Sequence, residues 1–96
     1  MNIQHKEEDG KGIFYVAEEK GTLAELVYSK TGNDTLTIQH TEVSDTLRGK
    51  NIGYLLVNAA AAYARENHLK ISSRCTFATA IFNKKKAEFE DVLKGN

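Results

Sequence analysis

The sequence contains no proline, no tryptophan and only one cysteine. A single cysteine cannot form a disulfide within the chain, so we expect no cross-link, and a reducing compartment, the cytoplasm, is the simplest location. The 13 basic and 13 acidic side chains cancel to a formal net charge of zero. This balance argues against binding to nucleic acid or to an anionic membrane by bulk electrostatics.

Long apolar runs are missing as well. The longest stretch without a charged residue, 51–64, is shorter than the roughly 20 apolar residues that a membrane span needs. Residues 1–10 are polar and acidic and lack the apolar segment of a signal peptide. No repeat or linker divides the 96 residues, so we expect one domain over residues 1–96, which we take to be a monomer.

The first half of the chain has the period of β-strands. Three runs rich in β-branched and aromatic residues are separated by turns that contain glycine, asparagine or clustered charges. The expected strands are residues 13–17, 22–29 and 35–43. They predict an antiparallel meander, in which Leu36, Ile38 and His40 of the third strand share one face.

The second half changes to a helical period. From Ile52 onward apolar side chains recur with the spacing of one helix face, and a run of alanines adds high helix propensity. The expected face consists of Ile52, Leu55, Leu56, Ala59, Ala60 and Tyr63. Arg65 suits the carboxyl end of this helix, and we expect Asn67 to end it in a left-handed conformation.

A short strand over residues 69–75 follows the helix. Its expected face holds Leu69, Ile71, Ser73 and Cys75. Residues 76–86 are expected to form a second helix and residues 89–93 a short final element. A strand, a crossover helix and a second strand form a βαβ unit, whose two strands lie parallel and adjacent. The prediction is therefore an α+β protein with a mostly antiparallel sheet, one parallel pair and two main helices.

Two residues with useful chemistry stand where such sheets bind ligands, beyond the carboxyl ends of the parallel strands. His40 lies near that end of the first parallel strand and Cys75 at that end of the second. If the strands are neighbours, His40 is the natural partner of Cys75. Each residue also has a structural explanation, Cys75 as a small buried hydrophobe and His40 as a satisfied histidine on a mostly apolar face.

The segment between the third strand and the first helix can hold a phosphate. Residues 45–53 form a turn with glycine and asparagine that leads directly into the helix, where unpaired backbone N–H groups and the positive helix pole attract anions. Arg48 and Lys50 add positive charge, which suits a diphosphate. The glycines can equally serve only to allow a tight helix entry, with both cations solvated. Neither the P-loop pattern nor G-x-G-x-x-G is present.

The run Arg48-Gly49-Lys50-Asn51-Ile52-Gly53 resembles the acetyl-CoA-binding loop (Q/R)-x-x-G-x-(G/A) of the GCN5-related N-acetyltransferases, with Asn51 in place of the central glycine. The order of this loop, an Ala-rich helix and Ser73-Arg74-Cys75-Thr76-Phe77 is similar to the small single-domain branch of that family, over about residues 23–93. The resemblance implies the compact fold of this family and transfer of an acetyl group from acetyl-CoA to an amine acceptor, which the sequence does not identify.

The same resemblance implies roles for individual residues. The main-chain groups of Thr41, Glu42 and Val43 are expected to pair with the pantetheine arm of acetyl-CoA. The pyrophosphate is expected to be held by Arg48, Gly49, Lys50, Asn51, Ile52 and Gly53. Cys75 is implied as the catalytic residue. Asn51 reaches left-handed geometry readily, but its side chain can crowd the approach to phosphate.

The helix after the second parallel strand offers further contacts. It can bring Asn83 to the amides of the donor and one lysine of the run 84–86 to its 3′-phosphate, although such a run is most often a solvated face. The histidines and the cysteine lack the close spacing of a zinc site, so no metal is predicted, and His5 and His68 are expected at the surface.

Two chemistries are open for an enzyme. The amine can attack the thioester directly, or Cys75 can accept the acetyl group first, with His40 as a base for the thiol or for the amine. A rival from another class is a non-catalytic acyl-CoA-binding or protein-interaction module, because so short a chain has little material for an acceptor pocket. The loop alone would also fit a nucleotide-diphosphate binder.

Overall fold

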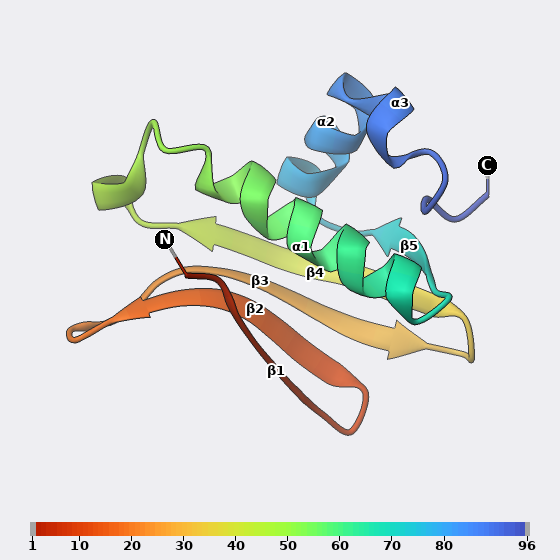
Figure 1. Cartoon of the computed structure of the whole chain (residues 1–96), viewed down its shortest axis with the longest axis horizontal. Helices are drawn as coiled ribbons and strands as arrows, with labels where there is room; N and C mark the ends of the chain where they lie inside the picture. The colour runs from red at the N-terminus through yellow and green to blue at the C-terminus, as the bar shows by residue number, and fades with distance from the viewer. Residues whose placement is uncertain (1, 96) are drawn as a thin grey trace.

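Five strands form one sheet in the order β1-β2-β3-β4-β5 in the computed structural model, which describes residues 2–95 (Figure 1). The strands are β1 (Gln4–Glu8), β2 (Lys11–Glu18), β3 (Gly21–Thr31), β4 (Thr35–Val43) and β5 (Lys70–Ser73). The helices are α1 (Ile52–Glu66), α2 (Thr76–Lys84) and α3 (Lys86–Phe89), with a 3-10 turn, η1 (Asp45–Leu47), before α1. Strands β1 to β4 pair antiparallel and β4 pairs parallel with β5. The predicted α+β fold with one parallel βαβ pair is confirmed.

The core lies between the sheet and the helices. Helix α1 crosses one face of the sheet, and α2 and α3 pack beside it near β5 (Figure 1). The strand residues that face α1 alternate along each strand and are fully or almost fully buried. They are Phe14, Val16, Ala24, Leu26, Tyr28, Leu36, Ile38 and Ile71. The opposite face of the sheet, called the open face below, carries the intervening residues of β2 and β3, which are only partly buried.

The buried face of α1 is rotated from the expected one. Gly53, Val57 and Ala61 are buried together with Ile52 and Leu56, whereas Leu55 is 38% exposed. The small residues on this side of α1, Gly53, Ala60, Ala61 and Ala64, allow the helix to lie close to the sheet, and Leu55 lies outside this face. None of the helices described within residues 2–95 is long and apolar enough to cross a membrane.

Strand β1 was not expected from the sequence. All of its residues are exposed, and it pairs with β2 from Gln4 opposite Tyr15 to Glu8 opposite Lys11. A charged edge strand has no apolar period, and the charges discourage pairing with another chain. His5 is exposed as expected, but its ring also stacks on Phe14 with 4.1 Å between ring centroids.

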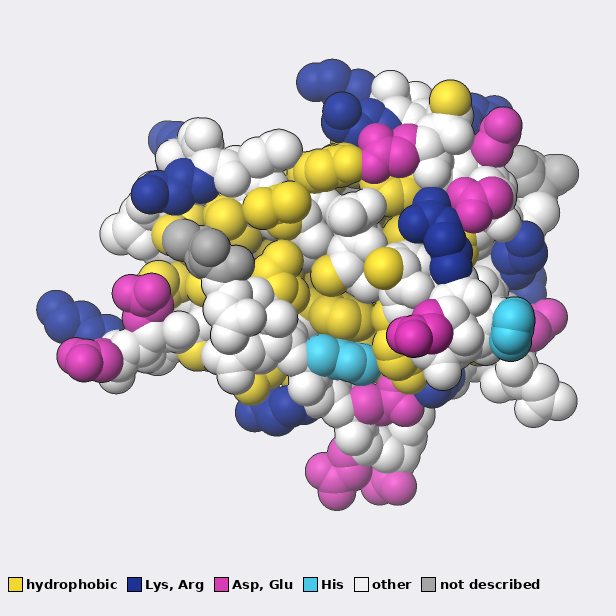
Figure 2. Space-filling view, viewed as in Figure 1, with side chains coloured by type: hydrophobic (Ala, Val, Ile, Leu, Met, Phe, Trp, Pro, Cys, Tyr) yellow, Lys and Arg dark blue, Asp and Glu magenta, His cyan; other side chains and the backbone are white. Residues whose placement is uncertain are grey.

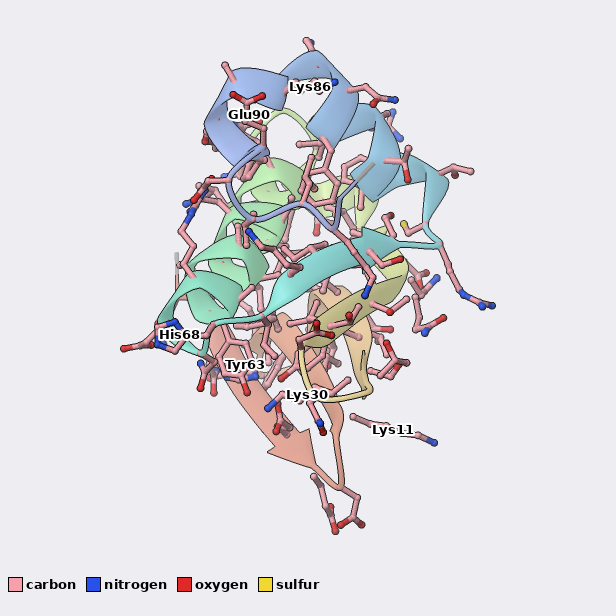
Figure 3. The ribbon with its side chains drawn as sticks, turned by 90° about the vertical axis from the view of Figure 1, so that its right-hand side faces the viewer. Lys11, Lys30, Tyr63, His68, Lys86 and Glu90 are labelled. Atoms are coloured by element: carbon pink, nitrogen blue, oxygen red, sulfur yellow. The ribbon has the colours of Figure 1, made fainter. Side chains whose placement is uncertain are left out.

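A polar cluster, the Glu7 cluster, ties β1 to α1 near the carboxyl end of that helix. The Glu7 carboxylate accepts hydrogen bonds from Tyr28 (2.5 Å) and Tyr63 (2.7 Å) and pairs with Lys30 (3.0 Å). His5 Nε2 lies 2.6 Å from the Tyr28 hydroxyl. Figure 3 shows Tyr63 and Lys30 together at this end of the molecule, and the Lys30 ammonium lies 5.2 Å from the centre of the Tyr63 ring. The Glu7 carboxylate therefore links three elements, β1, β3 and α1.

The end of α1 differs by one residue from the prediction. Asn67 has a φ of -103°, and its side-chain amide donates to the Tyr63 carbonyl. His68 has the left-handed conformation instead, with a φ of 59°. Asn67 thus caps the helix through its side chain, which leaves the change of direction to the next residue.

The carboxyl-terminal elements are shorter than expected. Strand β5 covers four residues within the expected 69–75, and the expected helix over 76–86 ends at Lys84 before the single turn of α3. The tail then returns to the sheet, where Leu93 forms a bridge with Ile71. The edge of β5 is therefore partly covered.

A β-bulge in β4 sets which side chains reach the helices. Ile38 pairs with Tyr28 of β3 and His40 with Val27, so Gln39 is an extra residue. Before the bulge Ile38 faces α1. After it, Thr41 pairs with the buried Leu26 and faces the helices, so His40 faces the open side. The expectation that His40 shares the face of Leu36 and Ile38 is wrong, because an inserted residue reverses the alternation.

Candidate functional site

The two parallel strands separate at their carboxyl ends. Their pairing ends at Ile38 opposite Ser73, and the Arg74 amide still donates to the Ile38 carbonyl at 2.8 Å. Strand β4 continues to Val43 while the chain after Cys75 turns into α2. Within residues 2–95, no strand pairs with the β5 side of β4 beyond this point. This free edge of β4, residues 39–43, can bind an extended ligand through its main chain.

The loop before α1 turns sharply through left-handed residues. Gly49 has a φ of 82°, and Asn51, the residue that stands in place of the family's glycine, has a φ of 61°. Asn51 is also the N-cap of α1, and its side chain makes no capping hydrogen bond. The first N–H groups of α1 therefore lack a side-chain cap and can bind an anion, assisted by the positive end of the helix dipole.

A cavity of about 310 Å³ lies between this loop and α2. We call it the donor cavity, because its lining includes residues that the sequence predicts to bind the acetyl donor. Its lining is Val43, Leu47, Arg48, Gly49, Asn51, Ile52, Gly53, Tyr54, Phe77, Ile81, Lys84 and Lys85. The lining includes basic residues from both sides and no carboxylate. Figure 2 shows basic side chains over the loop that precedes α1 and over α2, with apolar surface between them. Such a cavity favours an anionic ligand with an apolar portion.

The predicted donor-binding residues divide into two sets. Val43, Arg48, Gly49, Asn51, Ile52 and Gly53 line the donor cavity. Thr41, Glu42 and Lys50 are not part of its lining, although Thr41 and Glu42 belong to the free edge of β4. The Arg48 guanidinium forms an exposed ion pair with Asp45 at 2.6 Å, so an incoming anion competes with that carboxylate.

Some lining residues were not predicted. Tyr54 and Leu47 flank the expected loop residues, and Phe77 and Ile81 come from α2. Phe77 and Ile81 lie four residues apart on the expected second helix, and this spacing was the available signal that they share a face. Of the lysine run, Lys84 and Lys85 line the cavity.

Cys75 lies where β5 leads into α2. It is 9% exposed and is the N-cap residue of α2. Its Sγ is 3.4 Å from the Thr41 hydroxyl, and its main-chain N–H donates to Ser73 Oγ at 3.2 Å. Burial raises the pKa of the Cys75 thiol, but hydrogen bonds with Thr41 and with the Phe77 and Ala78 backbone lower it, and the net shift is downward. The thiolate of Cys75 therefore forms at a lower pH than that of a cysteine buried without such partners.

His40 and Cys75 are not brought together. His40 points to the open face and lies 3.3 Å from the Glu42 carboxylate, whereas Cys75 contacts Thr41 on the helix side. The predicted partnership fails because of the bulge in β4. Ligand atoms of Glu25, His40 and Glu42 all lie within 4.8 Å of one another. Exposed groups of this kind are common without an ion, so the absence of a metal stays a prediction.

Asn83 lies beside Cys75 rather than beside the loop. It lines a second cavity together with Ser73, Arg74, Cys75, Thr76, Thr79 and Ala80. This cavity and the donor cavity lie along the same short helix, α2, and have no lining residue in common. Asn83 therefore lies on the Cys75 side of α2 and away from the loop before α1.

The chain is an α+β protein with one parallel βαβ pair in a mixed five-stranded sheet and a basic, left-handed turn before the crossover helix. A family model described as GCN5-related N-acetyl-transferase matches residues 13–92. The chain therefore belongs to the GCN5-related N-acetyltransferases, a family that transfers acyl groups from acetyl-CoA. The resemblance seen in the sequence is confirmed.

Relatives of known sequence or structure agree with this assignment. Protein NATD1 of Xenopus tropicalis is 39% identical over 54 residues, which is 56% of this chain and 50% of that protein. The chain thus spans about half the length of the curated relatives it matches. A GCN5-like protein of Staphylococcus aureus, solved by NMR, is 38% identical, with a TM-score of 0.75 over 99% of this chain and 91% of that one. Tetrahymena GCN5 shares the fold at 11% identity, with a TM-score of 0.65 over 81% of this chain and 51% of that one.

Proposed function

We propose that this protein transfers an acetyl group from acetyl-CoA to an amine and that the acetyl group passes through Cys75. The observation that carries the proposal is a convergence at the point where β4 and β5 separate. The Cys75 thiol contacts the free edge of β4 at Thr41, and the donor cavity begins at Val43, the last residue of that edge. In acetyl-CoA the thioester, the extended pantetheine arm and the phosphates follow one another. Cys75, the free edge of β4 and the donor cavity can receive them in that order.

The chain has a group for each part of the donor. We assign the pantetheine arm to the main chain of Thr41, Glu42 and Val43 on the free edge of β4. The pyrophosphate is assigned to residues 48–53, where the left-handed turn exposes N–H groups and Arg48 supplies charge. Lys84 and Lys85, on the opposite side of the donor cavity, suit the 3′-phosphate.

Cys75 performs the first chemical step in this proposal. Its thiolate attacks the carbonyl carbon of the thioester, a new carbon–sulfur bond forms on Cys75, and the bond from that carbon to the coenzyme A sulfur breaks. The coenzyme A thiolate leaves and takes up one proton, which balances the proton lost by Cys75. The acetyl group is then held on the enzyme as a thioester of Cys75.

The acceptor amine performs the second step. Its nitrogen attacks the acetyl carbon on Cys75, the amide bond forms, and Cys75 leaves as the thiolate. His40 lies on the open face beside Glu42 and apart from Cys75, so of its two expected roles we assign it proton acceptance from the amine before the amine reaches Cys75. The proton passes from the amine to His40 and then to water.

Mass spectrometry of the intact protein tests the covalent step. After incubation with acetyl-CoA alone, we expect one added acetyl group that is lost on treatment with hydroxylamine and absent in Cys75→Ala. His40→Gln should still form the adduct but release product more slowly with an amine present. Turnover without any adduct, or full turnover by Cys75→Ala, would replace this route with direct transfer.

A second candidate is a non-catalytic acyl-CoA-binding module. It is favoured by the open face, because no helix covers that side of β2 to β4 among residues 2–95. Few residues could therefore surround an acceptor there. Calorimetric titration with acetyl-CoA, followed by a thiol-release assay with a panel of amines, separates the two. Binding without release of coenzyme A would favour the module, and no binding at high micromolar concentration would exclude both.

A further inference from the structure

We infer that Thr41 is a positioning residue for Cys75: its hydroxyl holds the Cys75 sulfur at the free edge of β4 to which its own main chain belongs. The inference rests on the proposed function, because it concerns the nucleophile of that reaction. It assigns to the side chain of Thr41 a role that is separate from the expected role of its main chain. One residue would then join the site of donor binding to the reacting sulfur.

The contact is made by a residue that the bulge turns toward the helices. If Gln39 were paired regularly and the bulge were absent, alternation from Ile38 would direct His40 toward α1 and Thr41 to the open face. With the bulge, Thr41 pairs with the buried Leu26, is itself half-buried, and places Oγ1 3.4 Å from the Cys75 sulfur. The bulge in β4 therefore decides which side chain meets the cysteine.

The partners of the sulfur are neutral. Besides the Thr41 hydroxyl, the backbone groups of Phe77, Ala78 and Thr41 lower the pKa of the thiol, and none of these groups carries a charge. The nearest charged residues in the sequence lie elsewhere: His40 and Glu42 face the open side, and Arg74 is exposed. Among residues 2–95, Thr41 is then the one side chain within hydrogen-bonding distance of Cys75 Sγ, and its hydroxyl is uncharged.

The hydroxyl can serve both states of the cysteine. The thiol donates its proton to Thr41 Oγ1, and after deprotonation the hydroxyl rotates and donates to the thiolate. The hydroxyl keeps its own proton throughout, so the reaction remains balanced as written above. Its effect is to stabilise the thiolate before attack and again when Cys75 leaves the acetyl group.

Alkylation of the intact protein by iodoacetamide tests the contact without any donor. Cys75 is the only cysteine in the sequence, so incorporated label reports on it alone. Thr41→Val removes the hydroxyl at nearly constant volume, and Thr41→Ser keeps it. At pH 7 we expect alkylation of Thr41→Val to be about 3- to 10-fold slower than that of the native protein, with Thr41→Ser within about twofold. At high pH, where every form is a thiolate, the difference should close.

A matched control and a fold check complete the experiment. Thr22→Val makes the same change on an exposed residue of β3 and should alkylate at the native rate. Circular dichroism establishes that each variant is folded, and valine suits a strand position. If folded Thr41→Val is alkylated at the native rate at pH 7, or if Thr41→Ser is as slow as Thr41→Val, the inference is overturned. A deficit that persists at high pH also overturns it, because that result reports access to the sulfur.

The outcome is separable from that of the proposed function. In turnover assays Thr41→Val should lower kcat more than it changes KM, because the main-chain contacts with the donor remain. If the native protein neither binds acetyl-CoA nor turns over while its alkylation profile depends on Thr41, the proposed function fails and the contact stands. If acetyl-Cys75 forms normally in Thr41→Val at pH 7, the proposed function stands and the role of Thr41 is refuted.

Discussion

The ring of Tyr28 lies against the backbone of Gly12, its partner on the neighbouring strand, and a Cβ atom at Gly12 would collide with the ring and its hydroxyl. Tyr28 is fully buried, and its hydroxyl is hydrogen-bonded to Glu7 and contacts His5. The ring therefore cannot move aside without breaking the Glu7 cluster. Glycine is needed here for the close approach.

We expect Gly12→Ala to lower the free energy of unfolding by about 2–3 kcal/mol, because the added methyl group displaces a buried, hydrogen-bonded ring. Urea unfolding followed by circular dichroism measures the change. In a Tyr28→Leu background the same substitution should cost clearly less, since the colliding atoms are gone. An equal cost in both backgrounds would show that the ring is not responsible.

Gly53 makes a similar close approach with the opposite expected result. A Cβ atom there would collide with the Phe77 ring, but that ring is 44% exposed and can rotate outward. We expect Gly53→Ala to change stability by less than about 1 kcal/mol, because the clash is relieved and alanine favours the helix. Affinity for acetyl-CoA should fall several-fold, since the wall of the donor cavity is altered. Calorimetry on Gly53→Ala and on Phe77→Ala separates the methyl group from the displaced ring.

Acid should weaken the Glu7 cluster. The hydrogen bond from Tyr28 is the main reason that the pKa of Glu7 falls from 4.5 to about 2, with Tyr63 and Lys30 contributing and burial opposing. Because the folded protein lowers this pKa, the contribution of Glu7 to stability is complete above pH 4.5 and is lost as the pH falls toward 2. Burial also lowers the pKa of His5, which adds a loss of stability in acid below pH 6.5.

Glu7→Gln should therefore unfold more easily at neutral pH, by about 1–2 kcal/mol, and lose less stability between pH 4.5 and 2 than the native protein does. Urea midpoints across this range provide the measurement. Glu8→Gln, on the other face of the same strand, is the matched control. Parallel acid profiles for the native protein and Glu7→Gln would contradict the assignment.

Asp45 should restrain donor binding. Its carboxylate pairs with the Arg48 guanidinium at 2.6 Å, and this exposed pair must open or share the guanidinium when a diphosphate arrives. We expect Asp45→Asn to raise affinity for acetyl-CoA by about two- to fivefold at low salt, with the gain shrinking as salt increases. Asp9→Asn, in the turn after β1, removes the same charge elsewhere and should have little effect. Weaker binding by Asp45→Asn would mean that Asp45 orders Arg48 for the ligand.

The lysine run offers an internal comparison. Lys84 and Lys85 line the donor cavity, whereas Lys86 starts α3 and is exposed. We expect Lys84→Ala and Lys85→Ala to weaken binding of acetyl-CoA by about 3- to 10-fold and Lys86→Ala to leave it nearly unchanged. The loss should be smaller with acetyl-dephospho-CoA, which lacks the 3′-phosphate. Equal losses with both donors would place these lysines at another part of the ligand.

Local patterns were sufficient for most elements of the fold. The alternation of strands β2 to β4, the apolar period of α1 and the crossover that makes β4 and β5 parallel follow from side-chain spacing and chain handedness. Strand β1 has no such pattern because it is a charged edge strand. It is held by pairing with β2 and by the contacts of Glu7 and His5 with side chains far along the chain.

Residues close together in the chain set the local backbone chemistry of the site: a left-handed turn through Gly49 and Asn51 before a helix, with Arg48 beside it, and Cys75 at a strand end. These features depend on which φ angles a residue tolerates and on side chains close in the chain. The tertiary structure decided the partners. One extra residue in β4 exchanged His40 for Thr41 opposite Cys75, because a bulge reverses the alternation of side chains and is visible only once the strands are paired.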